Sequence, residues 1–189
     1  MNFTEQQLAQ SFRQGDRAAF EELVSRWNQN VTNLAYRMTG NQEDARDMAQ
    51  QCFLRAFQAR DQFEGGSSLG TWLYRITINL CRDRLRSQQS RRRQIERLAT
   101  RRHRPGHRPP PPPELESEQG EVSTQVAHAV TTLTDDQREV VILRHYHDLS
   151  CREIAEILQT PYTTVRSRLV QGLNELRLKL RNLNPCACS

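Results

Sequence analysis

A short helix with a clear start, a proline break and a second, longer helix constrain this chain more than any other feature. Ser150 is followed three residues later by Glu153, the capping-box spacing that begins a helix. Apolar residues then recur at helical spacing at Ile154, Ala155, Ile157 and Leu158. The helix breaks at Gln159-Thr160-Pro161 because proline fits poorly inside a helix, and helical periodicity resumes from Thr163 to Leu180. Two helices joined by so short a turn are typical of a helix-turn-helix.

The charge of these two helices indicates which of them would touch DNA. From Tyr162 to Arg181, five basic residues stand against one acid, Glu175. Between Glu121 and Glu156, three arginines stand against seven acids, which would repel a DNA duplex. This asymmetry favours contact with DNA by the second helix alone, in a major groove. The alternative is an ordinary helical hairpin with a solvated charged face.

The chain divides into two small helical domains. Its 189 residues are 36% hydrophobic, which is lean for a single large core. From Ser87 to Gly120 the periodicity fades, eight arginines stand against four glutamates, and Pro109–Pro113 forbid a continuous helix. We therefore predict an all-α protein with a flexible Arg/Pro-rich linker. Its predicted parts are a first domain 1–86, a linker 87–120, a second domain 121–183 and a cysteine-containing tail 184–189.

Two helices of the first domain carry distinctive polar surfaces. One begins at Asn41 and has an acidic start, which the helix dipole alone would favour. The other covers 71–86 and has two stripes. Leu73, Ile76 and Leu80 predict a core stripe, and a second stripe could stack on bases and contact phosphate. That second stripe consists of Trp72, Arg75, Asn79, Arg82 and Arg86. On the residues alone, a core tryptophan beside a solvated basic face is the favoured interpretation.

Several classes of protein are disfavoured by what the sequence lacks. No apolar run approaches the roughly 20 residues that cross a bilayer, and the N-terminus lacks signal-peptide features, so we expect a cytoplasmic protein without membrane insertion. Glycine-rich phosphate loops and catalytic triads are not evident, so we expect no enzyme and no cofactor. Five cysteines do not form a disulfide framework. Cys186 and Cys188 could bind a soft metal or sense oxidants, but zinc prefers four ligands, and we predict no metal site.

Several blocks of sequence occur in an order that resembles a known family. In the first half they are GDRAAFEEL (15–23), DARDMAQQCFLRA (44–56) and TWLYRI (71–76), followed by Asn79 and Asp83. In the second half they are LT (133–134), QREV (137–140), LS (149–150), EIAEIL (153–158) and TVRSRL (164–169). The chain resembles the extracytoplasmic-function (ECF) group of bacterial RNA polymerase sigma factors, over nearly all of residues 10–182. Such proteins have two globular regions, sigma region two and sigma region four.

The resemblance implies three binding surfaces. The core polymerase surface would comprise Asp44, Asp47, Gln50 and Gln51. The reader of the minus-ten promoter element would comprise Phe63, Gly65, Ser67, Trp72, Arg75, Asn79 and Arg82. The minus-thirty-five element would be contacted by Thr163, Thr164, Arg166, Ser167 and Arg168. The implied function is promoter-specific transcription initiation, for a stress or envelope-signal regulon, with core RNA polymerase, promoter DNA and a possible anti-sigma factor as partners.

Some positions depart from the family pattern. Gln50-Gln51 stands where Gln-Glu is usual, Gln159 where glycine is frequent, and Tyr162 where a small aliphatic residue is frequent. The linker is unusually rich in proline and arginine, and we predict that its arginines line the path of the template strand or of RNA inside the polymerase. The alternative function is a stand-alone helix-turn-helix repressor. Such a repressor would use its other domain for a dimer interface or a ligand pocket.

Overall fold

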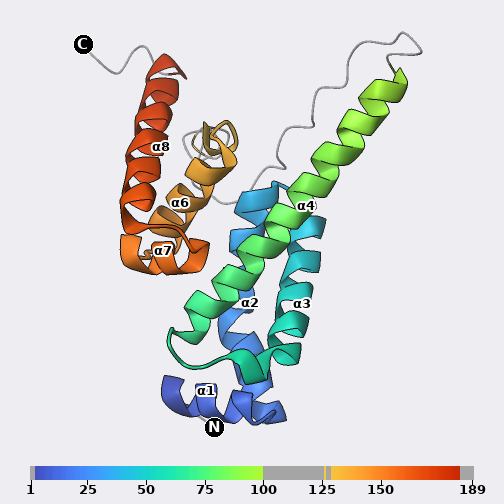
Figure 1. Cartoon of the computed structure of the whole chain (residues 1–189), viewed down its shortest axis with the longest axis vertical. Coiled ribbons are helices and arrows are strands. Elements are labelled where there is room, and N and C mark those ends of the chain that lie inside the picture. Colours follow the sequence, from blue (N-terminus) through green and yellow to red (C-terminus); the bar gives the residue numbers. More distant parts are fainter. Residues whose placement is uncertain (1–2, 100–125, 127–128, 184–189) are drawn as a thin grey trace.

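A computed structural model describes residues 3–99, 126 and 129–183, and every regular element among them is helical (Figure 1). This agrees with the predicted all-α class. The linker residues 100–120, most of the segment 121–128, and Cys186 and Cys188 lie outside the described residues. The helices are α1 (Glu5–Arg13), α2 (Arg17–Thr39), α3 (Gln42–Gln58), the short 3-10 helix η1 (Arg60–Gln62), α4 (Leu69–Ala99), α6 (Asp135–Tyr146), α7 (Cys151–Leu158) and α8 (Tyr162–Leu183).

Helices α1 to α4 form the first bundle, and their ends follow from local sequence. Asp16 and Asn41 cap α2 and α3 through their side chains, because each accepts a hydrogen bond from a backbone N–H of the first turn. Gly40 ends α2 with a φ of 68°, a left-handed conformation that glycine adopts without strain. The buried side chains that hold the bundle together include Phe12, Leu23, Leu34, Ala45, Cys52, Leu73 and Ile78.

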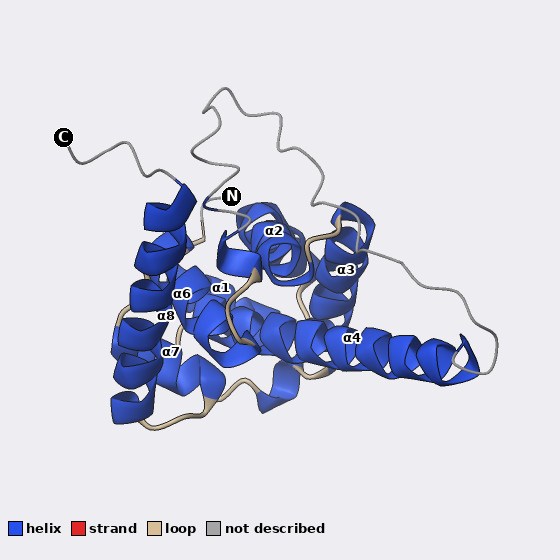
Figure 2. Cartoon of the chain, turned by 90° about the horizontal axis from the view of Figure 1, so that it is seen from above, coloured by secondary structure: helices blue, strands red, loops and turns tan. Residues whose placement is uncertain are grey.

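Helix α4 is longer than the sequence pattern predicts. It continues past Arg86, where we place the end of the first domain, as far as Ala99 (Figure 2). The segment 87–99 contains no proline or glycine and consists largely of arginine, glutamine, leucine and alanine, which favour a helix without an apolar face. Residues 91–95 are exposed to solvent. The loss of apolar periodicity therefore marks the point where α4 leaves the bundle, while the helix itself continues.

Helices α6, α7 and α8 form the second bundle. The capping box predicted at Ser150 is present: the Ser150 hydroxyl accepts from the Glu153 N–H, and the Glu153 carboxylate accepts from the Ser150 N–H. The core of this bundle includes Val140, Leu143, Ile154, Ile157, Val165 and Leu176. On α8, Leu173 is exposed, whereas its neighbour Gly172 is buried where α8 packs against α6.

The two bundles lie side by side. Helix α6 packs against α2, and α7 packs against α4 (Figures 1 and 2). The N-terminal two thirds of α4 therefore packs against the first bundle and α7 along part of its surface, whereas its C-terminal third projects away from both.

Candidate nucleic-acid interface

Helices α7 and α8 form the predicted helix-turn-helix, and the turn between them is tight. Gln159 ends α7 with a φ of 50°, in the left-handed region, and its N–H donates to carbonyls of the last turn of α7. The N–H of Thr160 donates to the carbonyl of Ala155 over 3.0 Å, and the N–H of Thr164 donates to the carbonyl of Pro161 over 2.9 Å. The proline therefore stands just before α8, where its missing N–H costs nothing.

The predicted minus-thirty-five residues lie in the first two turns of α8. Thr163, Arg166 and Ser167 are exposed, and Thr164 is half-buried. Arg168 differs from these because its guanidinium forms an ion pair with Asp136 at the start of α6. The exposed side chains thus present one free guanidinium and two hydroxyls on one end of a helix, a combination that suits base edges and phosphate.

Two of the predicted minus-ten residues are core residues. Trp72 is 7% exposed and Phe63 is 3% exposed. Their ring centroids lie 5.3 Å apart, and the centroid of Phe12 lies 6.1 Å from that of Trp72. Neither ring offers a free face on which a base could stack in this conformation. The core interpretation of Trp72, favoured by the residues alone, describes the structure better than a base-stacking role does.

The remaining minus-ten residues are more accessible. Asn79 is exposed and Arg75 is half-buried, one turn apart on α4. Gly65 lies in the exposed loop before α4 with a φ of 76°, and Ser67 is half-buried. Ser68, which the sequence analysis did not single out, accepts a hydrogen bond from the Thr71 N–H over 3.0 Å and so caps α4. The loop is therefore anchored at its C-terminal end.

Arg82, the last predicted member of the stripe, is engaged within the protein. Its Nε and Nη2 atoms donate to the two carboxylate oxygens of Glu139 on α6, over 2.7 and 2.6 Å. Hydrogen bonding to Glu139 raises the pKa of Arg82. Glu139 is 1% exposed, so it is not part of the acidic surface that the charge pattern predicted for this stretch. No pattern in the sequence indicates that Arg82 contacts Glu139, which lies 57 positions away.

The four predicted polymerase-binding residues of α3 are not equivalent. Asp47, Gln50 and Gln51 are exposed, whereas Asp44 is 6% exposed. The Asp44 carboxylate forms an ion pair with Arg84 and accepts a hydrogen bond from Gln88 over 2.8 Å. Asp44 therefore attaches α3 to α4, and its charge is not available to a partner in this conformation.

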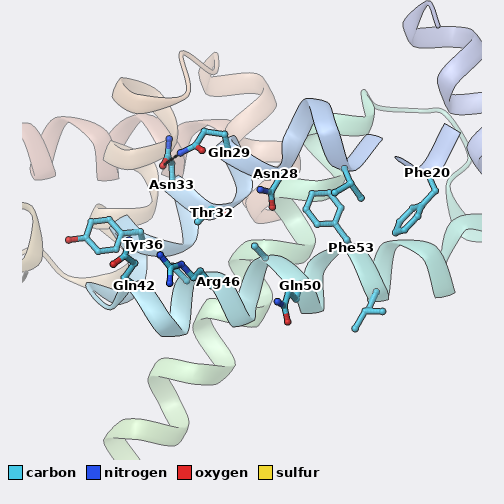
Figure 3. A pocket seen from close by; sticks show the side chains of 14 residues that line it. Phe20, Asn28, Gln29, Thr32, Asn33, Tyr36, Gln42, Arg46, Gln50 and Phe53 are labelled. Atoms are coloured by element: carbon cyan, nitrogen blue, oxygen red, sulfur yellow. Dashed lines mark hydrogen bonds between the residues drawn. The ribbon is translucent and has the colours of Figure 1, made fainter. Parts of the chain in front are cut away.

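A groove of about 1170 Å³ runs between α2 and α3, and Gln50 is among its lining residues (Figure 3). Its lining is rich in amides, contributed by Asn28, Gln29, Asn33, Gln42 and Gln50. Among these described lining residues, Arg46 supplies the single charge. Phe20, Val24 and Phe53 add apolar surface. Such a lining suits a polypeptide partner that offers backbone and side-chain hydrogen bonds.

The buried cysteines have no reactive character. Burial raises the pKa of the Cys52 thiol to about 11 and that of the Cys81 thiol to about 12. Over the described part of the chain, no group of three or more His, Cys, Asp or Glu side chains could hold a metal ion. No described helix is long and apolar enough to cross a membrane.

Comparison with known proteins assigns this chain to a family. The family described as Sigma-70 region 2 matches residues 23–91, and Sigma-70, region 4 matches residues 123–176. The ECF RNA polymerase sigma factor SigW of Bacillus subtilis is 33% identical over 175 residues, covering 90% of this chain and 94% of SigW. The chain belongs to the ECF group of sigma-70 factors. The ECF RNA polymerase sigma-E factor of Haemophilus influenzae is also 33% identical, over 184 residues, covering 95% of this chain and 97% of that protein.

Solved structures share the fold of this ECF chain. CnrH in complex with the cytosolic domain of CnrY has a TM-score of 0.70 at 23% identity, covering 94% of this chain and 97% of that one. The sigma factor RpoE in complex with the anti-sigma factor NepR, from Bartonella quintana, has a TM-score of 0.63 at 23% identity, covering 86% and 96%. In this chain, the region 2 match includes α3 and the stripe on α4, and the region 4 match includes the helix-turn-helix.

Proposed function

We propose that this chain is a sigma factor that binds core RNA polymerase and directs promoter-specific transcription initiation. The observation that carries the proposal is the presence of both sigma regions in one chain, with relatives named as sigma factors aligned over 90% or more of its length. A stand-alone repressor would not need a region 2. As a transcription initiation factor, the chain would act in the cytoplasm, with catalysis left to the polymerase.

The minus-ten element is proposed to bind at the loop around Gly65 and the exposed part of the α4 stripe. Asn79 and Arg75 offer an amide and a guanidinium to an unpaired base and its phosphate. Phe63 and Trp72 would not contact DNA themselves. Their rings pack against each other and so hold the loop against the start of α4. In this proposal the two aromatic residues position the site, and the polar residues contact DNA.

The minus-thirty-five element is proposed to receive the N-terminal end of α8 in its major groove. Arg166 is free to bridge O6 and N7 of a guanine, and Thr163 and Ser167 could hold phosphate oxygens. Arg168 would have to exchange Asp136 for DNA, so its contribution is expected to be smaller.

Core polymerase is proposed to dock on α3 and the groove beside it. Asp47 and Gln51 lie one turn apart and are exposed, and Gln50 is one of the residues that line the groove. The carboxylate of Asp47 would meet a basic residue of the large subunit. An anti-sigma factor is a proposed partner that would compete for these surfaces.

Binding to purified core polymerase tests this function directly. Asp47→Lys with Gln51→Lys should weaken the affinity of the full chain for core enzyme at least about tenfold, since two new positive charges would face a basic partner. Glu21→Lys, an exposed change on α2, is the matched control and should bind as the unmodified chain does. If the unmodified chain binds duplex DNA but not core polymerase, it acts as a repressor and the proposal fails.

The arginines of the projecting end of α4 are proposed to contact template strand or RNA inside the polymerase. Arg91, Arg92 and Arg93 are consecutive and exposed. Replacing all three with alanine should slow open-complex formation and reduce its dependence on salt concentration, because fewer phosphate counterions would be released. Open-complex formation with unchanged rate and salt dependence would refute this role.

A further inference from the structure

Two adjacent acids begin α6, and they pair with arginines of different helices. Asp135 and Asp136 occupy the first two positions of α6. Asp135 forms an ion pair over 3.4 Å with Arg138, three positions further along the same helix. Asp136 forms an ion pair with Arg168 of α8. Asp136 is therefore attached to the helix that carries the proposed minus-thirty-five contacts, whereas Asp135 pairs within its own helix.

The ion pair of Asp136 is not what holds α8 against α6. The two helices approach closely at Gly172, where an added β-carbon would lie 3.0 Å from Cγ2 of Val141. Nε2 of Gln137 also donates a hydrogen bond to the carboxylate of Glu175 over 3.3 Å. The Asp136 side chain is 56% exposed, and an ion pair open to solvent adds little stability. The effect of this pair is therefore to be sought in the charge of its arginine.

Arg168 lies where a free guanidinium would reach DNA. It is in the second turn of α8, one turn after Thr164, and both residues lie at the half-buried edge of the exposed side of the helix. An arginine beside the residues that enter a groove reaches phosphate on its long stem. Contact with phosphate raises the affinity for every DNA sequence equally, because phosphates carry no sequence information. Pairing with Asp136 withholds one such contact.

We propose that Asp136 limits the sequence-independent affinity of α8 for duplex DNA by holding Arg168 away from phosphate. The exposed Arg166 then reads base edges without a strong general attraction beside it. Because non-promoter sites greatly outnumber promoters, weaker binding to them leaves more protein for promoters. Asp136 is thus a positioning residue that acts through Arg168. This inference rests on the proposed function for the placement of α8 on DNA.

The proposal is tested with the full-length chain and a mixed-sequence DNA duplex, in titrations at several salt concentrations. Asp136→Asn keeps the shape of the side chain, removes its charge and so releases Arg168. We expect it to bind the duplex about three- to fivefold more tightly than Asp135→Asn does, the range for one exposed ion pair. The logarithm of its affinity should also fall more steeply with the logarithm of salt concentration, by about 0.9, for one added phosphate contact.

Asp135→Asn is the matched control. It removes the same charge from the adjacent position, and its side chain is 54% exposed, against 56% for Asp136. Both acids lie in the first turn of α6, where the helix dipole favours a negative charge. Any general effect of losing an acid is therefore shared by the two variants. Equal duplex affinity and equal salt dependence of the two variants overturn the proposal.

A second pair of variants tests whether Asp136 acts through Arg168. With Arg168→Ala in place, Asp136→Asn and Asp135→Asn should bind the duplex equally, because no guanidinium remains to be released. A difference that persists without Arg168 overturns the role assigned to Asp136. Asp136→Glu keeps a carboxylate and should have the affinity and salt dependence of the unmodified chain. If Asp136→Glu binds as tightly as Asp136→Asn, the carboxylate is not what restrains Arg168.

Helix content measured by circular dichroism shows whether each variant is folded. Asp136→Ser is a second way to release Arg168 and should show the same gain in affinity. Loss of helix content in both release variants would contradict the premise that the pair is not needed for packing, and would overturn the proposal. A folded Asp136→Asn protein without measurable duplex binding at low salt also overturns it. These titrations contain no polymerase, so failure of the unmodified chain to bind core polymerase would overturn the proposed function instead.

Discussion

The indole ring of Trp27 on α2 lies directly against Gly70 at the start of α4. A β-carbon placed on Gly70 would lie 2.0 Å from Cη2 of Trp27 and 2.6 Å from Cζ3, well inside van der Waals contact. Gly70 is therefore required by close packing, since its φ is not in the left-handed region. The contact sets the position of α4 relative to α2, and with it the position of the loop around Gly65.

Gly70→Ala should destabilise the protein through this contact. The new methyl group must displace a rigid aromatic ring, so we expect a loss of about 1–3 kcal/mol in the free energy of unfolding. Chemical denaturation followed by tryptophan fluorescence would measure it. Gly66→Ala is the control, because no atom lies within 4 Å of the β-carbon it would add. Equal stability of the two variants would contradict the packing role of Gly70.

Gln159→Gly should stabilise the protein. Gln159 holds a φ of 50° at the turn of the helix-turn-helix, a conformation that costs a residue with a β-carbon about 1 kcal/mol more than glycine. Relief of that strain should raise the midpoint of thermal unfolding by a few degrees without loss of DNA binding. A lower midpoint would mean that the Gln159 side chain makes a stabilising contact that outweighs the strain.

Local signals in the sequence predicted much of this fold. Asp16, Asn41 and Ser150 act as helix caps because a capping bond depends on residues only two or three positions away. The turn at Gln159 could be located for the same reason. Local rules also failed once: α4 continues past Arg86, because arginine and glutamine support a helix that has no apolar face to detect.

The parts of the site that depend on distant residues could not be predicted. Asp44 looks like a surface acid until Arg84, 40 positions away, pairs with it. The charge pattern likewise places Glu139 in an acidic surface, but in the structure it is paired with Arg82. Trp72 differs from these two residues, because the residues alone favour a core position for it, and the packing of Phe12 and Phe63 around it agrees. Charge and periodicity indicate where a helix lies and which of its faces is polar, but not which distant part of the chain packs against that face.

Acid should weaken the contact between the two regions, where the Nδ1 atom of His147, just after α6, lies 3.0 Å from the Tyr74 hydroxyl of α4. Burial, followed by the charge of Arg37, lowers the pKa of His147 from 6.5 to about 4, and Asp148 opposes this shift. The Nε2 atom of His147 is buried and has no hydrogen-bond partner among the described residues, so a proton there is disfavoured. The imidazole of His147 binds a proton more readily when it is exposed in the unfolded chain than when it is buried in the folded one. The contribution of the neutral, buried imidazole to stability is therefore full above about pH 6.5 and decreases as the pH falls towards 4.

The expected loss between pH 7 and pH 5 is about 2 kcal/mol, from the difference between the two pKa values. Measurements of the free energy of unfolding and of the radius of gyration between pH 7 and pH 5 would detect this loss. His147→Gln should remove that part of the pH dependence. If the His147→Gln protein shows the same slope as the unmodified chain, His147 is not the titrating group.

Arg166 and Arg168 should contribute unequally to promoter binding. Arg166→Ala removes an exposed guanidinium and should cost about 1–3 kcal/mol of binding to the minus-thirty-five element. Arg168→Ala should cost less, because Arg168 already pairs with Asp136. Gel-shift titration of the polymerase holoenzyme on a mapped promoter would compare them, with Arg177→Ala, further along α8, as the control. A larger loss for Arg168→Ala would reverse the proposed roles.

Run-off transcription with purified core polymerase tests the central claim most directly. Genomic fragments that include the region upstream of this protein's own coding sequence would be transcribed with and without the full chain. We expect discrete transcripts only when the chain is added, and their loss or reduction with Asn79→Ala or Arg166→Ala, two changes at exposed side chains that leave the core intact. Transcripts that do not depend on the chain, or a chain that binds duplex DNA without supporting initiation, would contradict its function as a sigma factor.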